Sequence, residues 1–375
     1  MSLKLLKVFF ATLCLLVLVF VIRIYTYDAY HFWSLKDPQN ARYSFNARIQ
    51  NAGFINHIDF DSIILGNSHM ENTSAEEASE IFGGKFFNLS MSGSNNYERS
   101  IVLKRAFETH NIKRVILLLT PSYSTEGHGN YPIETWNYLY DANCFNDFKY
   151  YLNTHDMRCM WAFSKKSDCF GQKKNLDRPY AWFEIPDHAS RFGGIQNWAR
   201  FYKNHQLEDL ITYEIPEAAN EVLTVGSPLS KKEKAKIRQS LDLTVFDFAQ
   251  QYPNTEFLIF FNPDSLLGKA LAFRNSLSFN QYSYFVREAV KKSDSFSNVY
   301  LFGFDNLTFT NDISYYKDTT HYIEDINSQL LHLMKIKKYS LRIDNVDDYL
   351  NELWGRLNNF NLGTFNQLLQ SKLPD

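Results

Sequence analysis

The sequence predicts an α/β protein: a three-layer α/β/α sandwich with a parallel sheet, a large insertion and an N-terminal transmembrane helix. From residue 57 onward, short aliphatic and β-branched runs alternate with helical segments, as in sheets built from βαβ units. These runs are apolar throughout, which is typical of strands covered on both faces. A separate apolar run, 8–22, stands near the N-terminus behind Lys4 and Lys7.

The N-terminal run is expected to form an uncleaved membrane anchor, residues 1–25. Its 15 residues lie near the short limit for a spanning helix, and snorkelling side chains of Lys7 and Arg23 extend it. A signal peptide has the same basic start and apolar centre, but no small-x-small cleavage site follows the run. The short head favours a cytoplasmic N-terminus, with the bulk of the chain outside the inner or cytoplasmic membrane, in the periplasm or extracellular space. An interfacial aromatic belt is expected from Tyr25, Tyr27, Tyr30 and Trp33.

Composition narrows the class of protein. A hydrophobic content of 45% indicates a folded chain, and a formal net charge of −2 gives no electrostatic reason to expect a nucleic-acid partner. The cysteines form no CxxC pair and no Cys/His metal spacing, so no metal site is expected from them. No cofactor is expected either. Outside the membrane, Cys144, Cys159 and Cys169 would supply one disulfide and one free thiol, but the sequence does not select the pair. His128 and His155 could be metal ligands, yet neither has a second ligand at a suitable spacing.

The predicted elements follow in order along the chain. Strands are expected at 62–66, 85–90, 113–120, 255–263 and 297–304. Helices are expected at 74–82, 95–110, within 230–253, at 280–294 and at 323–336. Ser74 is the expected N-cap of the first helix, with Glu77 at the capping-box position.

The other segments lack this alternation. Residues 26–56 are interpreted as a stalk or packing segment, and 337–375 as a C-terminal extension of one or two amphipathic helices. The α/β domain is expected to span 57–336. An aromatic-rich insertion at about 121–245 would interrupt it and cover or shape a site, although a separate subdomain would give the same pattern. Core packing is favoured over sugar stacking for the tryptophans of this range, Trp136, Trp161, Trp182 and Trp198.

Residues able to carry chemistry gather where the predicted strands end. Ser68 follows the first strand, Gly93 follows the second, and Asp318 stands three residues before His321, ahead of the last core helix. In a parallel sheet these ends share one edge. A serine hydroxyl becomes nucleophilic when an imidazole takes its proton and a carboxylate fixes the imidazole tautomer. Backbone N–H groups of Ser68 and Gly93 could then face a developing oxyanion.

Each of these residues also has a purely structural interpretation. Ser68 could be a helix N-cap, Asp318 and His321 could be surface loop residues, and Gly93 could serve only a turn. Because Ser74 already supplies the N-cap of the next helix, Ser68 is not needed for that purpose. The three features together therefore favour a catalytic site.

Three segments resemble sequence blocks I, II and V of the SGNH/GDSL hydrolase superfamily: ILGNSH (64–69), NLSMSGSN (88–95) and KDTTHY (317–322). The resemblance covers about 57–125 and 250–336. It is greatest to the membrane-anchored acyltransferase-like branch, which includes the alginate O-acetyltransferase group and the D-alanyl transfer protein of teichoic acid synthesis.

The resemblance implies an SGNH-like fold and a role for each candidate residue. Ser68 would be the nucleophile, His321 the base and Asp318 the acid that orients it. The N–H groups of Ser68 and Gly93 would be the oxyanion donors.

Block III departs from the family pattern. The superfamily usually has Gly-x-Asn-Asp there, whereas the segment 117–124, LLLTPSYS, contains no asparagine. Asn88, Asn95 and Asn96 are the candidates left for a side-chain oxyanion donor. The same gap is common in the membrane-anchored branch, which favours that branch over the secreted lipases.

The main functional hypothesis is an extracytoplasmic, membrane-anchored serine O-acyltransferase or esterase that acts on a cell-surface glycan through a Ser-His-Asp triad and an acyl-enzyme. The resemblance alone supports the glycan acceptor. The alternative is a non-catalytic SGNH-like accessory protein that binds a glycan or a multi-spanning membrane acyltransferase. Inverted topology would instead give a cytosol-facing lipid esterase. The sequence identifies neither the acyl group nor the acceptor.

Overall fold

The computed structural model describes residues 3–122, 131–183, 185–203, 205–275 and 277–374. The chain divides into two compact units, the first formed by residues 1–59 and 129–176 and the second by residues 60–128 and 177–375. The candidate metal ligand His128 and the last two residues of the segment 117–124 lie outside the described residues.

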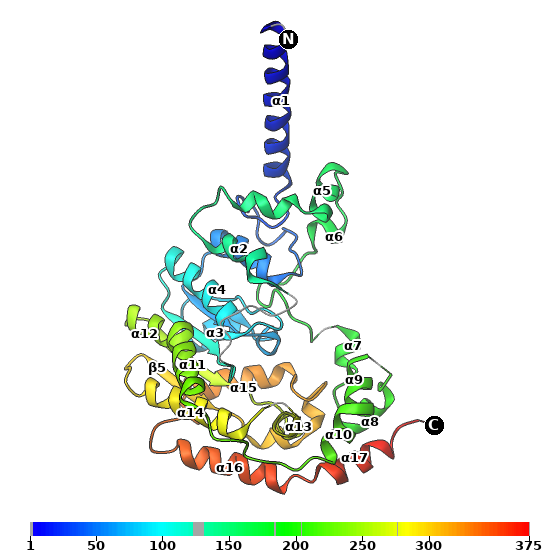
Figure 1. The fold of residues 1–375 in the computed structure, drawn as a ribbon, viewed down its shortest axis with the longest axis vertical. Helices are drawn as coiled ribbons and strands as arrows, with labels where there is room; N and C mark the ends of the chain where they lie inside the picture. Colours follow the sequence, from blue (N-terminus) through cyan, green and yellow to red (C-terminus); the bar gives the residue numbers. More distant parts are fainter. Residues whose placement is uncertain (1–2, 123–130, 184, 204, 276, 375) are drawn as a thin grey trace. The chain divides into compact units, whose positions relative to one another are not determined.

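The second unit contains a five-stranded sheet in the order β2-β1-β3-β4-β5 (Figure 1). Its strands are β1 (Ser62–Leu65), β2 (Phe86–Asn88), β3 (Arg114–Leu118), β4 (Glu256–Phe261) and β5 (Val299–Gly303). All neighbouring strands are parallel, and Ser62 of β1 lies opposite Phe86 of β2 and Arg114 of β3. Each strand falls within a range expected from its apolar run, so the prediction of an α/β fold with a parallel sheet is confirmed. The strand order changes direction at β1, where loops of an α/β sheet separate to leave room for a ligand.

The helices of the second unit connect and extend this sheet. They are α3 (Ala75–Phe82), α4 (Asn96–Thr109), α7 (Pro186–Ala189), α8 (Ile195–Arg200), α9 (His205–Asp209), α10 (Ile215–Ala219), α11 (Lys231–Leu241), α12 (Asp247–Gln251), α13 (Leu266–Asn275), α14 (Phe279–Ser293), α15 (Glu324–Lys335), α16 (Val346–Asn359) and α17 (Leu362–Gln370). Ser74 caps α3 as expected, because its hydroxyl accepts the Glu77 N–H at 2.9 Å. The Glu77 carboxylate accepts a hydrogen bond from Ser328 of α15. At α4 a reciprocal capping box forms: the side chain of Asn95 accepts the backbone N–H of Glu98, and the side chain of Glu98 accepts the backbone N–H of Asn95.

The pattern of apolar residues did not indicate α13. Seven of its ten residues are buried, among them Gly268 and Lys269. A helix buried on most sides has no polar face, so its sequence lacks the amphipathic period by which surface helices are recognised. Helix α2 (Ala47–His57) of the first unit has the same property, with nine of eleven residues buried, and it lies within the range interpreted as a stalk or packing segment.

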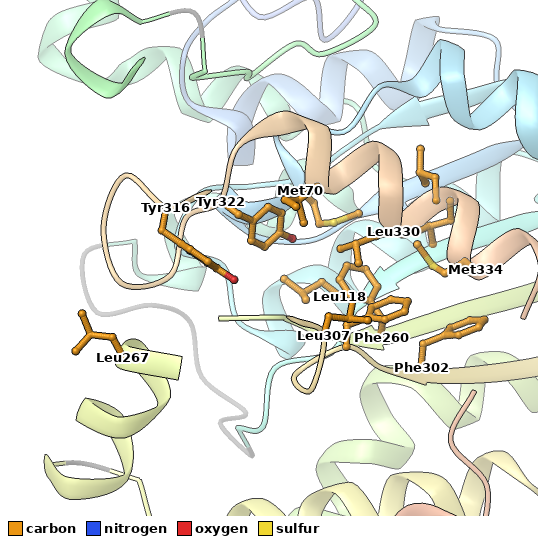
Figure 2. Close-up of a cluster of buried hydrophobic side chains, with 14 of the residues drawn as sticks. Met70, Leu118, Phe260, Leu267, Phe302, Leu307, Tyr316, Tyr322, Leu330 and Met334 are labelled. Atoms are coloured by element: carbon orange, nitrogen blue, oxygen red, sulfur yellow. The ribbon is translucent and has the colours of Figure 1, made fainter. Parts of the chain in front are cut away.

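A single hydrophobic cluster supports the loops that carry the candidate residues (Figure 2). Met70 enters it from the turn after β1, Phe260 from β4 and Leu330 from α15. Tyr316 and Tyr322 belong to the same cluster and are both at most 1% exposed. Because full burial of a large apolar side chain stabilises a fold by about 1.5–3 kcal/mol, the turn after β1 and the segment 316–322 are anchored in one core.

The first unit contains α1 (Leu3–Tyr27), α2, α5 (Thr154–Trp161) and α6 (Ser167–Phe170). Among the described residues, α1 is the one helix long and apolar enough to cross a membrane, and most of its length projects from the other helices of this unit (Figure 1). Cys159 and Cys169 form a disulfide between α5 and α6, with 5.5 Å between their Cα atoms, and Cys144 is a free thiol. The structure therefore pairs Cys159 with Cys169, a choice that the sequence left open.

The tryptophans of the range 121–245 are mostly core residues. Trp136, Trp182 and Trp198 are buried, as expected. Trp161 is 47% exposed. Sugar stacking in an open groove is therefore excluded for the three buried rings in this structure.

Candidate active site

Ser68 begins a short 3-10 turn (Ser68–Met70) that follows β1. The N-cap of this turn is Asn67, whose side-chain oxygen accepts the His69 N–H at 3.1 Å. The hydroxyl of Ser68 is therefore not used as a cap. Its Oγ lies 2.8 Å from Nε2 of His321, a residue 253 positions away in the sequence.

Hydrogen bonds at Gly66 join the loop after β1 to the loop after β2. The Gly66 carbonyl accepts the Met91 N–H at 2.9 Å and the Ser94 hydroxyl at 3.1 Å. Gly93 lies between these two donors, in a turn closed by the Ser94 N–H on the Met91 carbonyl, with φ at +64°. This positive φ explains the glycine, because other residues rarely adopt it. The turn of Gly93 is thus held against the residues that immediately precede Ser68.

His321 and Asp318 complete a hydrogen-bonded chain that starts at Ser68. The two carboxylate oxygens of Asp318 lie 3.0 and 2.9 Å from Nδ1 of His321. The backbone N–H groups of Thr320 and His321 also donate to this carboxylate, at 3.0 and 2.9 Å. A carboxylate at Nδ1 holds the imidazole proton on that nitrogen, so Nε2 is free to accept the hydroxyl proton of Ser68.

The segment that carries Asp318 and His321 is a closed loop pinned to the sheet. An antiparallel bridge joins Tyr316 and Tyr322 across its base. The Tyr316 hydroxyl donates to the Pro263 carbonyl at 2.7 Å, just beyond β4. Hydrogen bonds at both ends of the loop therefore fix it beside the carboxyl end of β4.

Asp318 stays ionised because its charge is compensated. Burial by itself would raise its pKa, but His321, Lys317 and the backbone donors outweigh that effect and hold the pKa well below the usual value. Lys317 is itself buried, with its Nζ 3.2 Å from the Asp318 carboxylate and 4.7 Å from the centre of the Trp182 ring. Burial lowers the pKa of Lys317.

Trp182 lies within the range predicted as an insertion and contacts several residues of this chain. Its indole N–H donates to the Ser68 carbonyl at 2.8 Å. Its ring meets the His321 ring edge-on, with 5.4 Å between the centroids. Trp182 therefore braces the Ser68 turn and the His321 ring from one side.

His69 packs against a face of the His321 imidazole. The two rings are stacked, with centroids 4.6 Å apart and 12° between their planes. The oxygen of Asn67 already accepts the His69 backbone N–H, so the Nδ1 contact of His69 to that oxygen at 2.6 Å identifies Nδ1 as the protonated nitrogen. Burial, and next the positive charge that His321 can carry, lower the pKa of His69 to about 3. His69 is therefore neutral at physiological pH.

A buried lysine bridges two carboxylates at the ends of β4 and β5, of which Asp305 is buried and Asp264 is partly exposed. Lys269 of α13 lies 3.2 Å from Asp264 and 2.9 Å from Asp305. Burial opposes the charge of Lys269, but the two carboxylates prevail and raise its pKa. Asp264 also lies 3.9 Å from Nε2 of His69, a separation too long for a hydrogen bond.

The expected oxyanion donors differ in how their hydrogens are used. Among the described residues, the N–H groups of Ser68 and Gly93 donate to no protein acceptor. The side-chain N–H groups of Asn88 donate to the Met70 and Thr73 carbonyls at 2.8 and 2.9 Å. Those hydrogens of Asn88 hold the turn after β1 and are already engaged.

The other two asparagine candidates lie at the start of α4. The side-chain nitrogen of Asn96 donates to the Thr120 and Ser122 carbonyls at 2.7 and 3.2 Å. The side-chain oxygen of Asn95 accepts the Glu98 N–H at 2.9 Å. Asn95 and Asn96 thus organise α4 and the end of β3 in this structure.

The histidine predicted as a weak metal candidate does not gain a metal site. His155 lies close to Cys159 and Cys169, but the sulfur atoms of these cysteines are bonded to each other. Nε2 of His155 lies 2.9 Å from the Asp168 carbonyl. A disulfide lacks the thiolates that bind zinc, so this group serves as a covalent brace.

Sequence reasoning missed His69, Lys317 and Trp182. His69 and Lys317 are sequence neighbours of Ser68 and Asp318, and that adjacency was the available signal. Trp182 had none, because 114 residues separate it from Ser68.

No protein-family model matches the chain, and no curated protein matches it significantly. The site is therefore interpreted from its own geometry. A serine hydroxyl, an imidazole and a carboxylate in one hydrogen-bonded chain, next to two unengaged backbone N–H groups, are the groups that acyl transfer through a serine requires.

Proposed function

We propose that this protein is a membrane-anchored serine O-acyltransferase or esterase whose active site lies outside the cytoplasmic membrane and acts on a cell-surface glycan. The observation that carries the proposal is the 2.8 Å contact between Ser68 Oγ and His321 Nε2, with Asp318 on the opposite nitrogen. A three-layer α/β/α sandwich of the SGNH/GDSL type, with α1 as its anchor, is part of the same proposal.

In the first half-reaction Ser68 Oγ attacks the carbonyl carbon of an acyl ester donor and its proton passes to His321. The N–H groups of Ser68 and Gly93 are the proposed donors to the oxyanion that develops, and one such donor is worth about 2.7–4 kcal/mol of barrier. The bond between the acyl carbon and the leaving oxygen then breaks, and His321 returns the proton to that oxygen. Asp318 stabilises the imidazolium between these steps.

In the second half-reaction an acceptor hydroxyl attacks the acyl-enzyme at Ser68. His321 takes the hydroxyl proton and passes it back to Ser68 Oγ as the new ester leaves. A glycan hydroxyl gives transfer and water gives hydrolysis, so transfer requires that the bound sugar exclude water. The glycan acceptor rests on the resemblance of the three sequence blocks, and a multi-spanning membrane acyltransferase is the proposed source of the acyl group.

Labelling with a fluorophosphonate tests the serine chemistry directly, because this probe reacts with activated serines. The full-length protein in detergent should be labelled on Ser68, and Ser68→Ala should abolish the label. Ser371 is exposed, so Ser371→Ala serves as a matched control and should leave labelling unchanged. Folded wild-type protein that takes no label would contradict the proposal and favour the non-catalytic accessory role.

Acceptor use requires a second measurement. With p-nitrophenyl acetate as donor, we expect release of nitrophenol by the wild type and only background release by Ser68→Ala. Added cell-envelope glycan should become acetylated by the wild type but not by Ser68→Ala. A periplasmic-type reporter fused after residue 375 should be active, whereas activity of a cytosolic reporter would contradict the proposed side of the membrane.

A further inference from the structure

The first unit exposes a group of large aromatic side chains that its core does not use. We call Phe145, Phe148, Trp161 and Phe163 the collar. Phe145 is 86% exposed and Phe163 69% exposed. Large apolar groups gathered on a surface indicate that something apolar covers them.

The collar residues lie beside the C-terminal part of α1. The ring of Trp161 stacks on Phe20 of α1, with 6.4 Å between the centroids. The guanidinium of Arg23 lies 3.9 Å from the centre of the Phe163 ring. An apolar cavity of about 510 Å³ lies between α1 and the loop that carries Phe145 and Phe148, and residues from Val17 to Tyr25 line its α1 side.

Polar contacts made by Tyr27 at the end of α1, and by the residues just after it, fix the helix against the rest of this unit. The Tyr27 and Tyr30 hydroxyls both donate to the Asp156 carboxylate of α5, at 3.2 and 3.1 Å. The Tyr151 hydroxyl donates to the Asp28 carboxylate at 3.1 Å. The disulfide between α5 and α6 closes the loop that carries Trp161 and Phe163. These hydrogen bonds and the disulfide therefore fix which residues of α1 lie beside the collar.

This position determines the depth of the collar once α1 crosses a bilayer. A helix rises 1.5 Å per residue, so a hydrocarbon core of about 30 Å holds about 20 residues. The apolar run 8–22 then lies in the hydrocarbon, and Val17 and Phe20 belong to it. Side chains that pack beside Val17 and Phe20 lie at the same depth. Trp161 stacks on Phe20, and Phe145 lines the same cavity as Val17 and Phe20.

We propose that the collar is a membrane-docking surface that inserts into the acyl-chain region of the lipid bilayer around α1. The occupant is lipid, because the collar is continuous with the exposed apolar surface of α1 and shares its depth. Arg23 and the belt residues Tyr25 and Trp33, stacked 5.9 Å apart, then lie at the headgroup level. The first unit is thereby held on the membrane surface by its loops as well as by α1. This inference requires α1 in a bilayer and requires no chemistry at Ser68.

Spin labels on single cysteines of the full-length protein in liposomes test this proposal. Cys144 is a native free thiol beside Phe145 and lines the cavity, so it carries the first label in a Cys14→Ser background. Phe163→Cys with both free cysteines changed to serine carries the second. Native Cys14 of α1, in Cys144→Ser, reports the bilayer, and Ile343→Cys in the second unit, 60% exposed, reports water. Labelling without reductant keeps the disulfide closed.

For each spin label, the accessibility to oxygen, which partitions into lipid, is compared with the accessibility to a water-soluble nickel chelate. The labels at 144 and 163 should shift in the same direction as the label at Cys14, with a gain in oxygen access and a loss of nickel access relative to position 343. Phe145→Asp with Phe163→Asp should return the label at Cys144 to water, whereas the matched Leu pair should not.

Nickel access at 144 and 163 equal to that at 343 would overturn the proposal. Low access to both agents would indicate a protein occupant, such as a second copy, and would overturn it as well. The label at Cys14 shows separately whether the anchor itself lies in lipid. The outcome is independent of fluorophosphonate labelling, so either proposal can fail alone.

Discussion

The imidazole of His69 lies flat against the imidazole of His321, with ring centroids 4.6 Å apart and 12° between the planes. One of these rings must accept a proton from Ser68 in the proposed reaction, and the other is kept neutral by its burial. A neutral aromatic neighbour supports the His321 ring without repelling the imidazolium that forms on it. His69 is on this basis a positioning residue for His321.

Replacing His69 should therefore slow acyl transfer through the orientation of His321. Aromatic pairs contribute about 0.5–1.5 kcal/mol beyond area burial, so His69→Ala should reduce the rate of acyl-enzyme formation by about 2–10-fold. His69→Phe retains the stack and should recover most of the loss. Single-turnover kinetics with p-nitrophenyl acetate measure this rate. Equal losses in the Ala and Phe variants would assign the effect to the Nδ1 contact with Asn67, and no loss in either would contradict a positioning role.

The same residue should make stability depend on pH. In the unfolded chain His69 binds a proton near the ordinary pKa of about 6.5, whereas the folded pKa is about 3. Between these values the unfolded state binds more protons, so the free energy of unfolding falls as pH falls, by at most about 1.4 kcal/mol per pH unit. Asp318 acts in a lower window: its depressed pKa adds stability above the ordinary value of about 3.8, and that stability is lost as pH falls below it.

Melting temperatures of the full-length protein in detergent between pH 4 and pH 8 measure this effect. His69→Phe should lose less stability than the wild type as pH falls from 6.5 to 4. Above pH 7.5 the two curves should run parallel, because His69 is neutral there in both states, and this interval is the internal control. Parallel curves over the whole range would show that the folded pKa of His69 is not depressed.

The carboxylate of Asp318 should matter for both chemistry and stability. Asp318→Asn leaves the shape of the side chain but cannot hold the Nδ1 proton of His321 in the same way, and a comparable change in a Ser-His-Asp triad lowers turnover about 10⁴-fold. It also leaves the buried ammonium of Lys317 without its counter-ion at 3.2 Å. The double variant with Lys317→Met should regain thermal stability but not turnover. Recovery of turnover in the double variant would assign Asp318 a structural role alone.

The parts of the fold that could be predicted from the sequence are those that leave a pattern within a short stretch of the chain. The five strands were predictable because continuous apolar runs reflect burial on both faces of a sheet. Helices α2 and α13 were not, since burial on nearly all sides removes the polar face that identifies a helix. Both helices depend on tertiary contacts that no local pattern records.

The same distinction holds for the candidate site. Ser68, Asp318 and His321 could be selected because strand ends and short spacings are local features, and the structure brings all three together. The stacking of His69 and the buried position of Lys317 arise only when the loops after β1 and β5 meet. Asn88 was a candidate oxyanion donor on the basis of the sequence. Only the fold shows that two carbonyls already accept the hydrogens of its side chain.

Gly268 of α13 allows the helix to approach the loop of Asp318 and His321. A Cβ at this position would lie 2.4 Å from the carbonyl oxygen of Thr319, well inside van der Waals contact, and the same carbonyl accepts the Ser265 hydroxyl at 2.6 Å. Gly268→Ala should displace the loop and lower the rate of fluorophosphonate labelling at Ser68 by about tenfold or more, because a small misplacement of catalytic groups is costly. Gly355→Ala is the matched control in α16, where a Cβ meets no atom within 4 Å; it should label as the wild type does and stabilise the protein by about 0.5–1 kcal/mol. Wild-type labelling in Gly268→Ala would mean that the loop adjusts without moving His321, and that the close approach of α13 does not set the geometry of the site.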